Sequence, residues 1–487
     1  MKRLTYLLFF TAFLRLDSQS QQFKVLYTAG AFRQAFSGKV LLYLNKENHS
    51  PKDAMADLEV FPCFAITVKD VKPGDTVVFD DKATSYPVAL SDLERGGYYV
   101  QAVWDRNLGG RVVAESPGNI YSTPVMVSLT KERGKWFTLV CDQVVKERSF
   151  VSTTFVKELR VTSELLSRSQ GRPTAVVAAV LLPKEYYSQP QRKFPVLYNV
   201  SGYGGDYHRY SGDTSNYGKL LDTLSCITVY LDGNCAGGHS VYANSDNNGP
   251  WGDALVKEFI PAMENTFRCD GARLLWGHSS GGWTVLWLQT HYPKVFAGCW
   301  SSSPDPVDFR SFQRVNLYEA DNIYYRKDSS HWLAATIAGQ YPVATMKQCY
   351  QEENVIYRGE QYHSFDFVFG PKGADGQPVP LCDPATGAID KKCFEHWKTY
   401  DISLYLRSKW ASLQKDLQGK VRVTVGNSDN FLLNYAVHML DDEMMKFGGP
   451  FVFVYYPGDH FTVATPQWMS EGNKFLASRY EVWKTNH

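Results

Sequence analysis

One short stretch sets the strongest limit on how this chain can fold. Residues 273–290 read RLLWGHSSGGWTVLWLQT, an apolar run followed by a turn of glycine and serine and then by a segment of helical character. A serine between glycines at a sharp strand-to-helix turn matches the G-x-S-x-G pattern. Glycine is needed beside such a serine because a Cβ would collide with the neighbouring strand or helix. The stretch predicts a strand–turn–helix unit that holds a serine side chain above a sheet.

Two serines compete for the centre of this pattern. In GHSSG, residues 277–281, glycines lie two positions to either side of Ser279. Centring the pattern on Ser280 would place His278 and Gly282 at the flanking positions, which fits less well. We therefore predict Ser279 as a nucleophile, and a purely structural glycine turn is the alternative interpretation.

Compact apolar runs recur on both sides of this turn, and helical segments separate several of them. In residues 251–267, Leu255, Phe259 and Met263 recur every four residues and form one apolar stripe. Buried strands that alternate with helices are typical of a mostly parallel sheet covered on both faces. The predicted strands are AVVAAVLLP, PVLYNVSG, CITVYLDGN, RLLWGHSS, VFAGCWSSS, VRVTVGNSD and FVFVYYPGD.

This pattern predicts an α/β domain over residues 151–487. The stretch from about 304 to 418 breaks its rhythm and is rich in Tyr, Asp and Gln. We interpret this stretch as an insertion with helices of its own.

Residues 21–150 have a different pattern. Short runs rich in Val, Tyr, Phe and Thr are separated by Gly and Pro, and no long helical period occurs among them. A spacing of roughly ten residues or more between such runs favours a β-sandwich. We therefore expect a smaller β-sandwich domain before the α/β domain.

The first 20 residues have the layout of a secretory signal peptide. Lys2 and Arg3 precede an apolar stretch, residues 4–14, which ends at Arg15. Such a stretch is too short to cross a bilayer, and its order of charge and apolarity is typical of an export signal. We expect a secreted or periplasmic protein without an integral membrane span, and a retained N-terminal segment is the alternative.

Net charge and cysteine content indicate which binding partners, metal sites and disulfides to expect. The formal net charge of +1 provides no field that would attract nucleic acid or an anionic membrane. None of the nine cysteines forms a CxxC pair, so a structural zinc site is not expected. Cys382 and Cys393 flank a loop with Pro and Gly, a spacing that would allow a disulfide in an oxidising compartment.

A serine hydroxyl needs a base to remove its proton. In hydrolases with a strand–serine–helix turn, the acid and then the histidine follow the serine along the chain. His460 lies on a loop after the apolar run 451–456, where such a base is expected. His438 falls in a helical stretch and His487 is the last residue, so both fit less well.

The acid should hold the histidine ring in place and stabilise its charged form. Asp429 follows the apolar run 421–426, one strand before His460, and is the first candidate. Asp305, after the preceding run, and Asp459, next to His460, are alternatives.

A tetrahedral intermediate needs two backbone N–H donors. Ser280 follows the predicted nucleophile and would supply one. The other should come from the glycine-rich loop 201–205, SGYGG, with Tyr203 or Gly204 as the donor. Trp251 and Trp283 are candidate aromatic contacts to a substrate, although each also fits a core position.

Taken together, these stretches resemble the "Putative esterase" family, which includes esterase D and enterochelin-esterase-like hydrolases. The resemblance covers roughly residues 194–461 apart from the insertion, in PVLYNVSGYGG, YLDGNCAGGHSVYANSDNNGPWGDALVKEFIP, LLWGHSSGGW, VTVGNSDNF and YYPGDHF. The N-terminal β region resembles the one found in secreted bacterial members. Many relatives have His where this chain has Ser201, which affects side-chain support of the loop and not its backbone donors.

The resemblance implies an α/β-hydrolase fold, ester hydrolysis and a triad of Ser279, Asp429 and His460, with no metal or organic cofactor. We expect a serine carboxylesterase acting on a small-molecule or carbohydrate-linked ester, such as an acetyl or feruloyl ester. A serine peptidase of the prolyl-oligopeptidase type fits less well, because residues 21–150 are too few and too irregular for a propeller of repeated blades. A non-catalytic binding protein is disfavoured by the complete triad.

Overall fold

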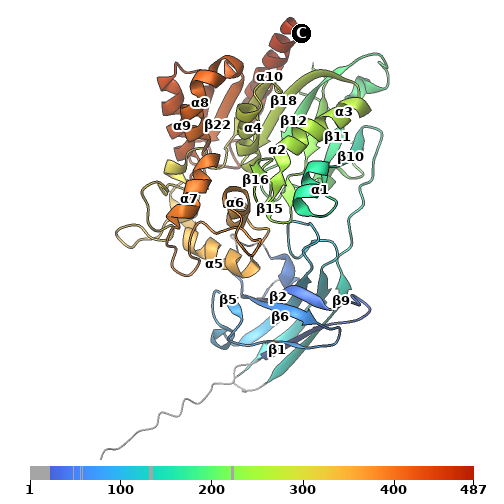
Figure 1. Ribbon diagram of the computed structural model, residues 1–487, viewed down its shortest axis with the longest axis vertical. Helices are drawn as coiled ribbons and strands as arrows, with labels where there is room; N and C mark the ends of the chain where they lie inside the picture. Colours follow the sequence, from blue (N-terminus) through green and yellow to red (C-terminus); the bar gives the residue numbers. More distant parts are fainter. Residues whose placement is uncertain (1–21, 48, 55, 57–58, 131–134, 221–223) are drawn as a thin grey trace, which may run out of the picture.

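The computed structural model describes residues 22–487 except 48, 55, 57–58, 131–134 and 221–223. The expected signal peptide, residues 1–20, lies outside the described residues. Two large sheets organise the chain: sheet A lies at the bottom of Figure 1 in blue, and sheet B lies above it among the helices. The predicted order of a smaller β-rich region followed by an α/β region is confirmed.

Sheet A contains nine strands and is mostly antiparallel. Its order is β4-β1-β9-β7-β6-β2-β3-β5, and β8 pairs with β6. Only β1 and β9 pair in parallel among these strands. The strands are β1 (Gln22–Tyr27), β2 (Phe36–Asn45), β3 (Cys63–Val71), β4 (Val77–Phe79), β5 (Thr84–Tyr86), β6 (Gly96–Asp105), β7 (Ile120–Ser122), β8 (Val125–Leu129) and β9 (Trp136–Val144).

Sheet A folds over its own core. The rings of Tyr27 on β1 and Trp104 on β6 have centroids 4.7 Å apart, although β9 and β7 lie between their strands. Three strand spacings in a flat sheet would separate the two backbones by about 14 Å. The fully buried Phe23, Val40 and Leu42 belong to the same cluster. The expected smaller β domain is therefore present, and hydrogen bonds join its nine described strands into one sheet around this core.

Sheet B contains eight strands in the order β10-β11-β13-β12-β18-β19-β22-β23. Its first two strands are antiparallel to their neighbours, and all pairs from β13 to β23 are parallel. The strands are β10 (Val156–Thr162), β11 (Ala175–Leu181), β12 (Phe194–Val200), β13 (Ile227–Leu231), β18 (Cys269–His278), β19 (Gly298–Ser302), β22 (Val421–Gly426) and β23 (Val452–Tyr456).

Helices cover both faces of sheet B. Leu275 packs in one cluster with Trp283 of α4, whereas its neighbour Leu274 packs in another with Leu476 of α10. Adjacent strand residues point to opposite faces, so a strand buried on both sides needs an unbroken apolar run. The covering helices are α1 (Glu164–Gln170), α2 (Trp251–Ala254), α3 (Ile260–Thr266), α4 (Ser280–His291), α8 (Ile402–Leu417), α9 (Asn434–Lys446) and α10 (Pro466–Asn486). This is the predicted α/β-hydrolase fold.

Residues 303–420 separate β19 from β22 and contain the predicted extra elements. Figure 1 shows α5, α6 and α7 between sheet B and sheet A, whereas α8 lies beside α9 and packs against α4. The last part of the expected insertion is therefore a helix of the main layer. The added elements are β20 (Leu333–Ile337), β21 (Tyr341–Thr345), α5 (Met346–Ile356), α6 (Gln361–Phe369) and α7 (Lys391–Trp397).

Short elements complete the chain. Two small hairpins follow β13, and single helical turns occur in several loops. They are β14 (Asn234–Cys235), β15 (Gly238–His239), β16 (Asn244–Ser245) and β17 (Gly249–Pro250), the 3-10 turns Pro51–Asp53, Leu90–Asp92, Lys184–Tyr186, Tyr207–Tyr210, Phe309–Ser311 and Lys398–Tyr400, and the π turn Leu255–Phe259.

The disulfide suggested by the spacing of Cys382 and Cys393 is absent. Both thiols are free and buried, and the Cys393 thiol donates to the Val379 carbonyl at 3.3 Å. Both side chains act as small apolar groups in the core of the insertion.

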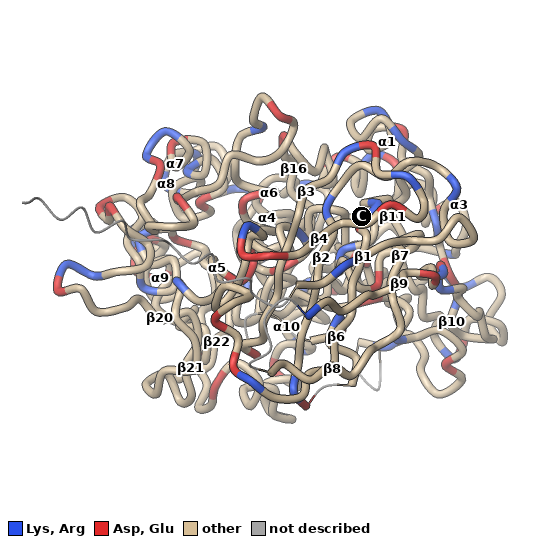
Figure 2. Tube along the Cα trace, turned by 90° about the horizontal axis from the view of Figure 1, so that it is seen from below, with Lys and Arg blue, Asp and Glu red and all other residues tan. Residues whose placement is uncertain are grey.

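The surface carries charges of both signs. Figure 2 shows Lys and Arg interspersed with Asp and Glu along the trace, in keeping with the net charge of +1. Within the described ranges, no helix combines the length and the apolar character that crossing a membrane requires.

Candidate active site

Ser279 lies in a strained turn between β18 and α4. Its backbone has φ 61° and ψ −127°, a region that non-glycine residues rarely adopt. Such a conformation costs on the order of 1–3 kcal/mol and persists only where its surroundings impose it. Here the Ser279 N–H donates to the Ser302 carbonyl at 2.9 Å, and the Ser279 carbonyl accepts from Trp283 N at 3.0 Å. The turn thus has the backbone expected for an exposed nucleophile.

The flanking glycines are required by contact with the backbone. A Cβ on Gly277 would lie 2.2 Å from the Gly281 carbonyl oxygen. A Cβ on Gly281 would lie 2.1 Å from the carbonyl oxygen of Val200 on β12. Neither approach is sterically allowed, so both positions exclude any larger residue. This packing supports Ser279, rather than Ser280, as the centre of the pattern.

The predicted acid and base meet at one edge of sheet B. Asp429 follows β22 and His460 follows β23, and these parallel neighbours end on the same side of the sheet. His460 Nδ1 lies 2.7 Å from Asp429 Oδ2, and both side chains are buried. Phe431 N donates to the other carboxylate oxygen at 2.9 Å and orients the acid. The other ring nitrogen of His460, Nε2, takes no part in the contact with Asp429.

The alternative residues point elsewhere. Asp459 accepts hydrogen bonds within its own turn from Thr462 N at 2.8 Å and from Phe461 N at 3.0 Å. His438 lies on α9 and stacks on Tyr455 with ring centroids 4.2 Å apart. The structure therefore pairs Asp429 with His460, as predicted.

His278 directly precedes Ser279, and its ring lies beside that of the predicted base, His460. Its ring centroid is 4.6 Å from that of His460, and its Nδ1 is 3.0 Å from Ser302 Oγ. Burial, with the neighbouring His460, lowers the pKa of His278 to about 4. A neutral His278 places no positive charge beside the base. Sequence reasoning missed this residue because the middle position of G-x-S-x-G accepts many side chains.

Asp305 is a second carboxylate in the site. It follows β19, its N–H donates to the Ser279 carbonyl at 3.4 Å, and its Oδ2 lies 3.5 Å from Gln361 Nε2 of α6. Burial raises the pKa of Asp305 to about 6, with His460 lowering it and Asp429 raising it to a lesser degree. This carboxylate supports the back of the turn, whereas Asp429 holds the histidine.

Asn430 was also missed by sequence reasoning. Its Oδ1 accepts from His460 N at 3.0 Å, and its Nδ2 donates to the Thr336 carbonyl at 3.0 Å. Thr336 lies on β20, so one side chain joins the insertion to the histidine loop. Its position directly after Asp429 was the available signal.

The loop Ser201–Gly205 runs against the turn. A Cβ on Gly202 would lie 3.2 Å from both Ser279 Cβ and the His278 carbonyl, so this backbone is in contact with the predicted nucleophile. The next residue, Tyr203, is one of the two predicted donors of this loop. Ser280 begins α4, where first-turn N–H groups lack helical acceptors and the helix dipole is positive. The two segments that carry the predicted donors therefore both adjoin Ser279, and the donors themselves stay a prediction.

Of the two tryptophans predicted to contact substrate, Trp283 needs correction, whereas Trp251 stays a prediction. Trp283 is 1% exposed and stacks on Trp287 in the core, with centroids 5.0 Å apart. Trp251 is 3% exposed, and its Nε1 donates to the Asn248 carbonyl at 3.0 Å. The Trp283 indole fills space in the core, which is the usual role of a large aromatic side chain in a buried helix. Trp251 also lines the cleft between the two sheets.

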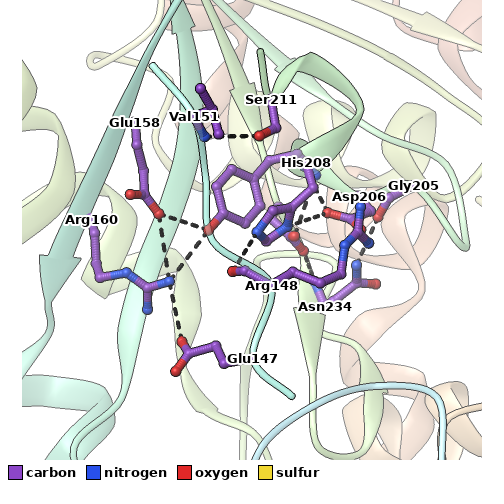
Figure 3. Close-up of polar contacts among 12 residues, drawn as sticks. Glu147, Arg148, Val151, Glu158, Arg160, Gly205, Asp206, His208, Ser211 and Asn234 are labelled. Carbon is purple, nitrogen blue, oxygen red and sulfur yellow. Dashed lines mark hydrogen bonds and ion pairs between the residues drawn. The ribbon is translucent and has the colours of Figure 1, made fainter. Parts of the chain in front are cut away.

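A cleft of about 1400 Å³ opens between the two sheets, next to the loop Ser201–Gly205. Gly204 lines the cleft, and an edge of Trp251 reaches it. Figure 3 shows one wall, where Arg148 pairs with Asp206 and His208 Nε2 lies 3.1 Å from the Arg148 carbonyl. The wall is polar and largely paired.

Metal ligands do not gather anywhere in the described part of the chain. No group of three or more His, Cys, Asp or Glu side chains there has an arrangement that would hold a metal ion.

Comparison with known proteins places this geometry in a family. Residues 169–443 match the family model described as "Putative esterase". None of the curated proteins compared with the chain matches it. Similar solved structures include a ferulic acid esterase, at 16% identity over 66% of this chain and 97% of that chain, with a TM-score of 0.39. An S-formylglutathione hydrolase from Agrobacterium tumefaciens has 15% identity over 68% of this chain and 99% of that chain, with a TM-score of 0.39.

A third similar structure is a fluorophosphonate-binding serine hydrolase from Staphylococcus aureus, at 15% identity over 66% of this chain and 97% of that chain, with a TM-score of 0.39. These likenesses concern the fold. The family model, in contrast, spans more than half of the chain. This protein therefore belongs to the "Putative esterase" family of serine hydrolases.

Proposed function

We propose that this protein is a secreted serine carboxylesterase that cleaves acetyl or feruloyl esters of carbohydrates through an acyl-enzyme. The observation that carries the proposal is the buried Asp429–His460 pair, 2.7 Å apart, beside the strained turn at Ser279. A base that is held in place beside a serine hydroxyl is the requirement for nucleophilic catalysis by serine.

In the proposed reaction, Ser279 Oγ attacks the ester carbonyl carbon while His460 Nε2 takes the hydroxyl proton. Asp429 holds Nδ1–H and stabilises the imidazolium that forms. The N–H groups of Ser280 and Tyr203 bind the oxyanion. The alcohol leaves with the proton from His460. Water, activated by the same base, then releases the acid and restores Ser279.

Aromatic side chains beside the base support an aryl acyl group. Phe461 is 67% exposed and its ring centroid lies 5.3 Å from that of His460. Phe431 lies 4.9 Å from the same ring and 6.1 Å from Phe461. We propose that this pair of rings contacts the aryl part of the acyl group.

The peptidase alternative loses its main support. Prolyl-oligopeptidase-type enzymes pair the hydrolase fold with a propeller of repeated blades. Sheet A, over its described strands, is one continuous sheet of nine strands without such blades.

Secretion is proposed from the N-terminal sequence alone. A basic pair, an apolar stretch of 11 residues and nearby small residues are typical of an export signal. Expression of the full chain in a bacterial host, followed by fractionation and N-terminal sequencing, tests this part. Full-length protein confined to the cytoplasm would contradict it.

Fluorophosphonate labelling tests the nucleophile. We expect the parent to be labelled, Ser280→Ala to remain labelled, and Ser279→Ala to lose both labelling and ester turnover, the latter by on the order of 10⁴- to 10⁶-fold. Loss of labelling in Ser280→Ala alone would assign the nucleophile to the other serine. A substrate series of acetylated sugars, feruloylated sugars and peptides then tests the class, and turnover of amides alone would refute the esterase proposal.

A further inference from the structure

Arg358 is a buried guanidinium at the junction of the two sheets. It lies between α5 and α6 and its side chain is 1% exposed. Nε and Nη2 each lie 2.6 Å from the carboxylate of Asp105, the last residue of β6, in a bidentate pair. Asp105 also accepts from Asn119 Nδ2 at 2.7 Å and from the hydroxyl of Tyr357. Both oxygens of the Asp105 carboxylate therefore accept hydrogen bonds.

The remaining nitrogen of Arg358 connects three parts of the chain. Nη1 donates to the carbonyls of Gly110 at 2.6 Å and Arg111 at 3.0 Å in the N-terminal domain, and of Ala236 at 3.0 Å after β13. Burying an ion pair costs desolvation energy that its attraction often does not recover, so such a pair is weak support for stability. The rigid fork of arginine is well suited to fixing geometry.

This junction touches the predicted oxyanion loop. Arg111 Nη1 donates to the Gly359 carbonyl at 2.8 Å, and its guanidinium lies 4.5 Å above the ring of Tyr203. The Tyr203 hydroxyl lies 2.7 Å from the same carbonyl and 2.8 Å from the carboxylate of Glu360. Gly359 has φ +87°, and a Cβ there would lie 2.1 Å from the Arg111 carbonyl, so these two backbones are in close contact.

The same loop is held from its other end. Asn234 Nδ2 donates to the Gly205 carbonyl at 2.7 Å, and Arg148, in the segment that links the two sheets, pairs with Asp206 (Figure 3). His208 Nδ1 lies 2.9 Å from Asp206 Oδ1. The loop is therefore anchored at Tyr203 and at Gly205 by residues from outside sheet B, whereas Gly202 contacts Ser279.

We propose that the N-terminal domain is a working part of the active site, and that Arg358 is a positioning residue for the oxyanion donor. Asp105 fixes Arg358, Arg358 fixes the backbone of Arg111, and Arg111 with Gly359 holds the side chain of Tyr203. The N–H of Tyr203 is thereby kept in the direction that the oxyanion requires. This inference rests on the proposed esterase function.

Three substitutions along this path test the proposal in the full-length protein: Arg358→Lys, Arg111→Met and Tyr203→Phe. Arg268→Met is the matched control, because Arg268 also stacks on a tyrosine, Tyr186, with its guanidinium 3.9 Å from the ring centroid, at the opposite end of β18 from Ser279. Each variant is assayed for kcat and KM with p-nitrophenyl acetate, for the rate of fluorophosphonate labelling and for thermal unfolding.

We expect the three variants to lower kcat by about 10- to 100-fold with KM changed less than twofold, since a small misplacement of a catalytic group affects the transition state most. The double variant of Arg111→Met and Tyr203→Phe should lose no more than the larger single loss, because both act on one path. Arg268→Met should retain kcat.

Three outcomes would overturn the proposal: unchanged kcat in folded Arg111→Met and Tyr203→Phe, a raised KM with kcat intact, or an equal loss of kcat in Arg268→Met. If Arg358→Lys does not fold, the kcat values of Arg111→Met and Tyr203→Phe are sufficient to test the proposal. A parent that neither labels nor turns over esters refutes the esterase function and this inference together, whereas an active parent with unaffected variants refutes the inference only.

Discussion

The turn at Ser279 and the junction at Arg358 face the same loop but are built differently. Around Ser279 the contacts are backbone against backbone, and the space for Cβ atoms is absent at Gly277 and Gly281. Around Arg358 the contacts are charged side-chain hydrogen bonds between residues 253 positions apart in the chain. One region is held by steric exclusion and the other by a satisfied buried charge.

The difference shows how two kinds of constraint support one site. Steric exclusion acts over a few residues, so it leaves a recognisable pattern of glycines. A buried ion pair depends on both partners at once, and removing one leaves the other uncompensated. We therefore expect a substitution in the turn to act through steric overlap. We expect a substitution at the junction to act by displacing the groups that the ion pair holds in place.

Gly281→Ala gives the largest expected effect and tests steric exclusion directly. Its Cβ would lie 2.1 Å from the Val200 carbonyl oxygen, so β12 or α4 must move. We expect the free energy of unfolding to fall by about 3 kcal/mol or more, and fluorophosphonate labelling to be lost. Urea unfolding measures the first and gel fluorescence the second.

Gly97→Ala is the control for this substitution. A Cβ on Gly97 meets only Met126 Sδ at 3.5 Å, an ordinary contact. Equal stability of the two variants would mean that the turn is not held by exclusion of a Cβ.

Asp305→Asn has an intermediate expected effect and probes the link between the two regions. Asp305 bonds to the Ser279 backbone, and its carboxylate approaches Gln361, three residues after Arg358. Burial raises its pKa from 3.8 to about 6. A raised pKa in the folded state means that this carboxyl stabilises the fold below pH 4, and that the contribution is lost as the pH rises through about 6.

The asparagine variant lacks this titration. Relative to the parent, we expect its free energy of unfolding to increase between pH 4 and pH 7.5, by at most about 3 kcal/mol at ~1.4 kcal/mol per pKa unit. Urea unfolding of both proteins at the two pH values measures the change. A difference between the proteins that does not vary with pH would contradict the expectation.

Phe461→Ala has the smallest expected effect on stability and separates binding from folding. The side chain is 67% exposed, so we expect the free energy of unfolding to change by less than about 0.5 kcal/mol. KM for a feruloyl ester should rise several-fold, while KM for an acetyl ester stays the same. Met445→Ala, at a side chain that is 65% exposed on α9, is the matched control. Equal effects on both esters would remove the support for an aryl acyl group.

Most strands of sheet B could be predicted because burial on both faces requires continuous apolar runs. β10 was missed because its sequence, VKELRVT, is not a continuous apolar run: it lies at the edge of the sheet and three of its seven residues are charged. The sequence leaves Trp283 open between a substrate contact and a core position, because composition cannot tell an exposed indole from one packed inside a helix layer. That distinction depends on α4, which is buried along nearly its whole length.

The sequence by itself determined the turn at Ser279, the order of Ser279, Asp429 and His460, and the alternation of strands with helices. These features depend on local steric contacts and on the spacing of apolar residues along the chain, and both can be recognised in the sequence. Only the tertiary structure decided that Asp429 rather than Asp305 or Asp459 pairs with His460, and that Asp105 and Arg358 meet beside Tyr203. Such contacts join distant segments, and their geometry depends on how the two sheets pack rather than on any local pattern.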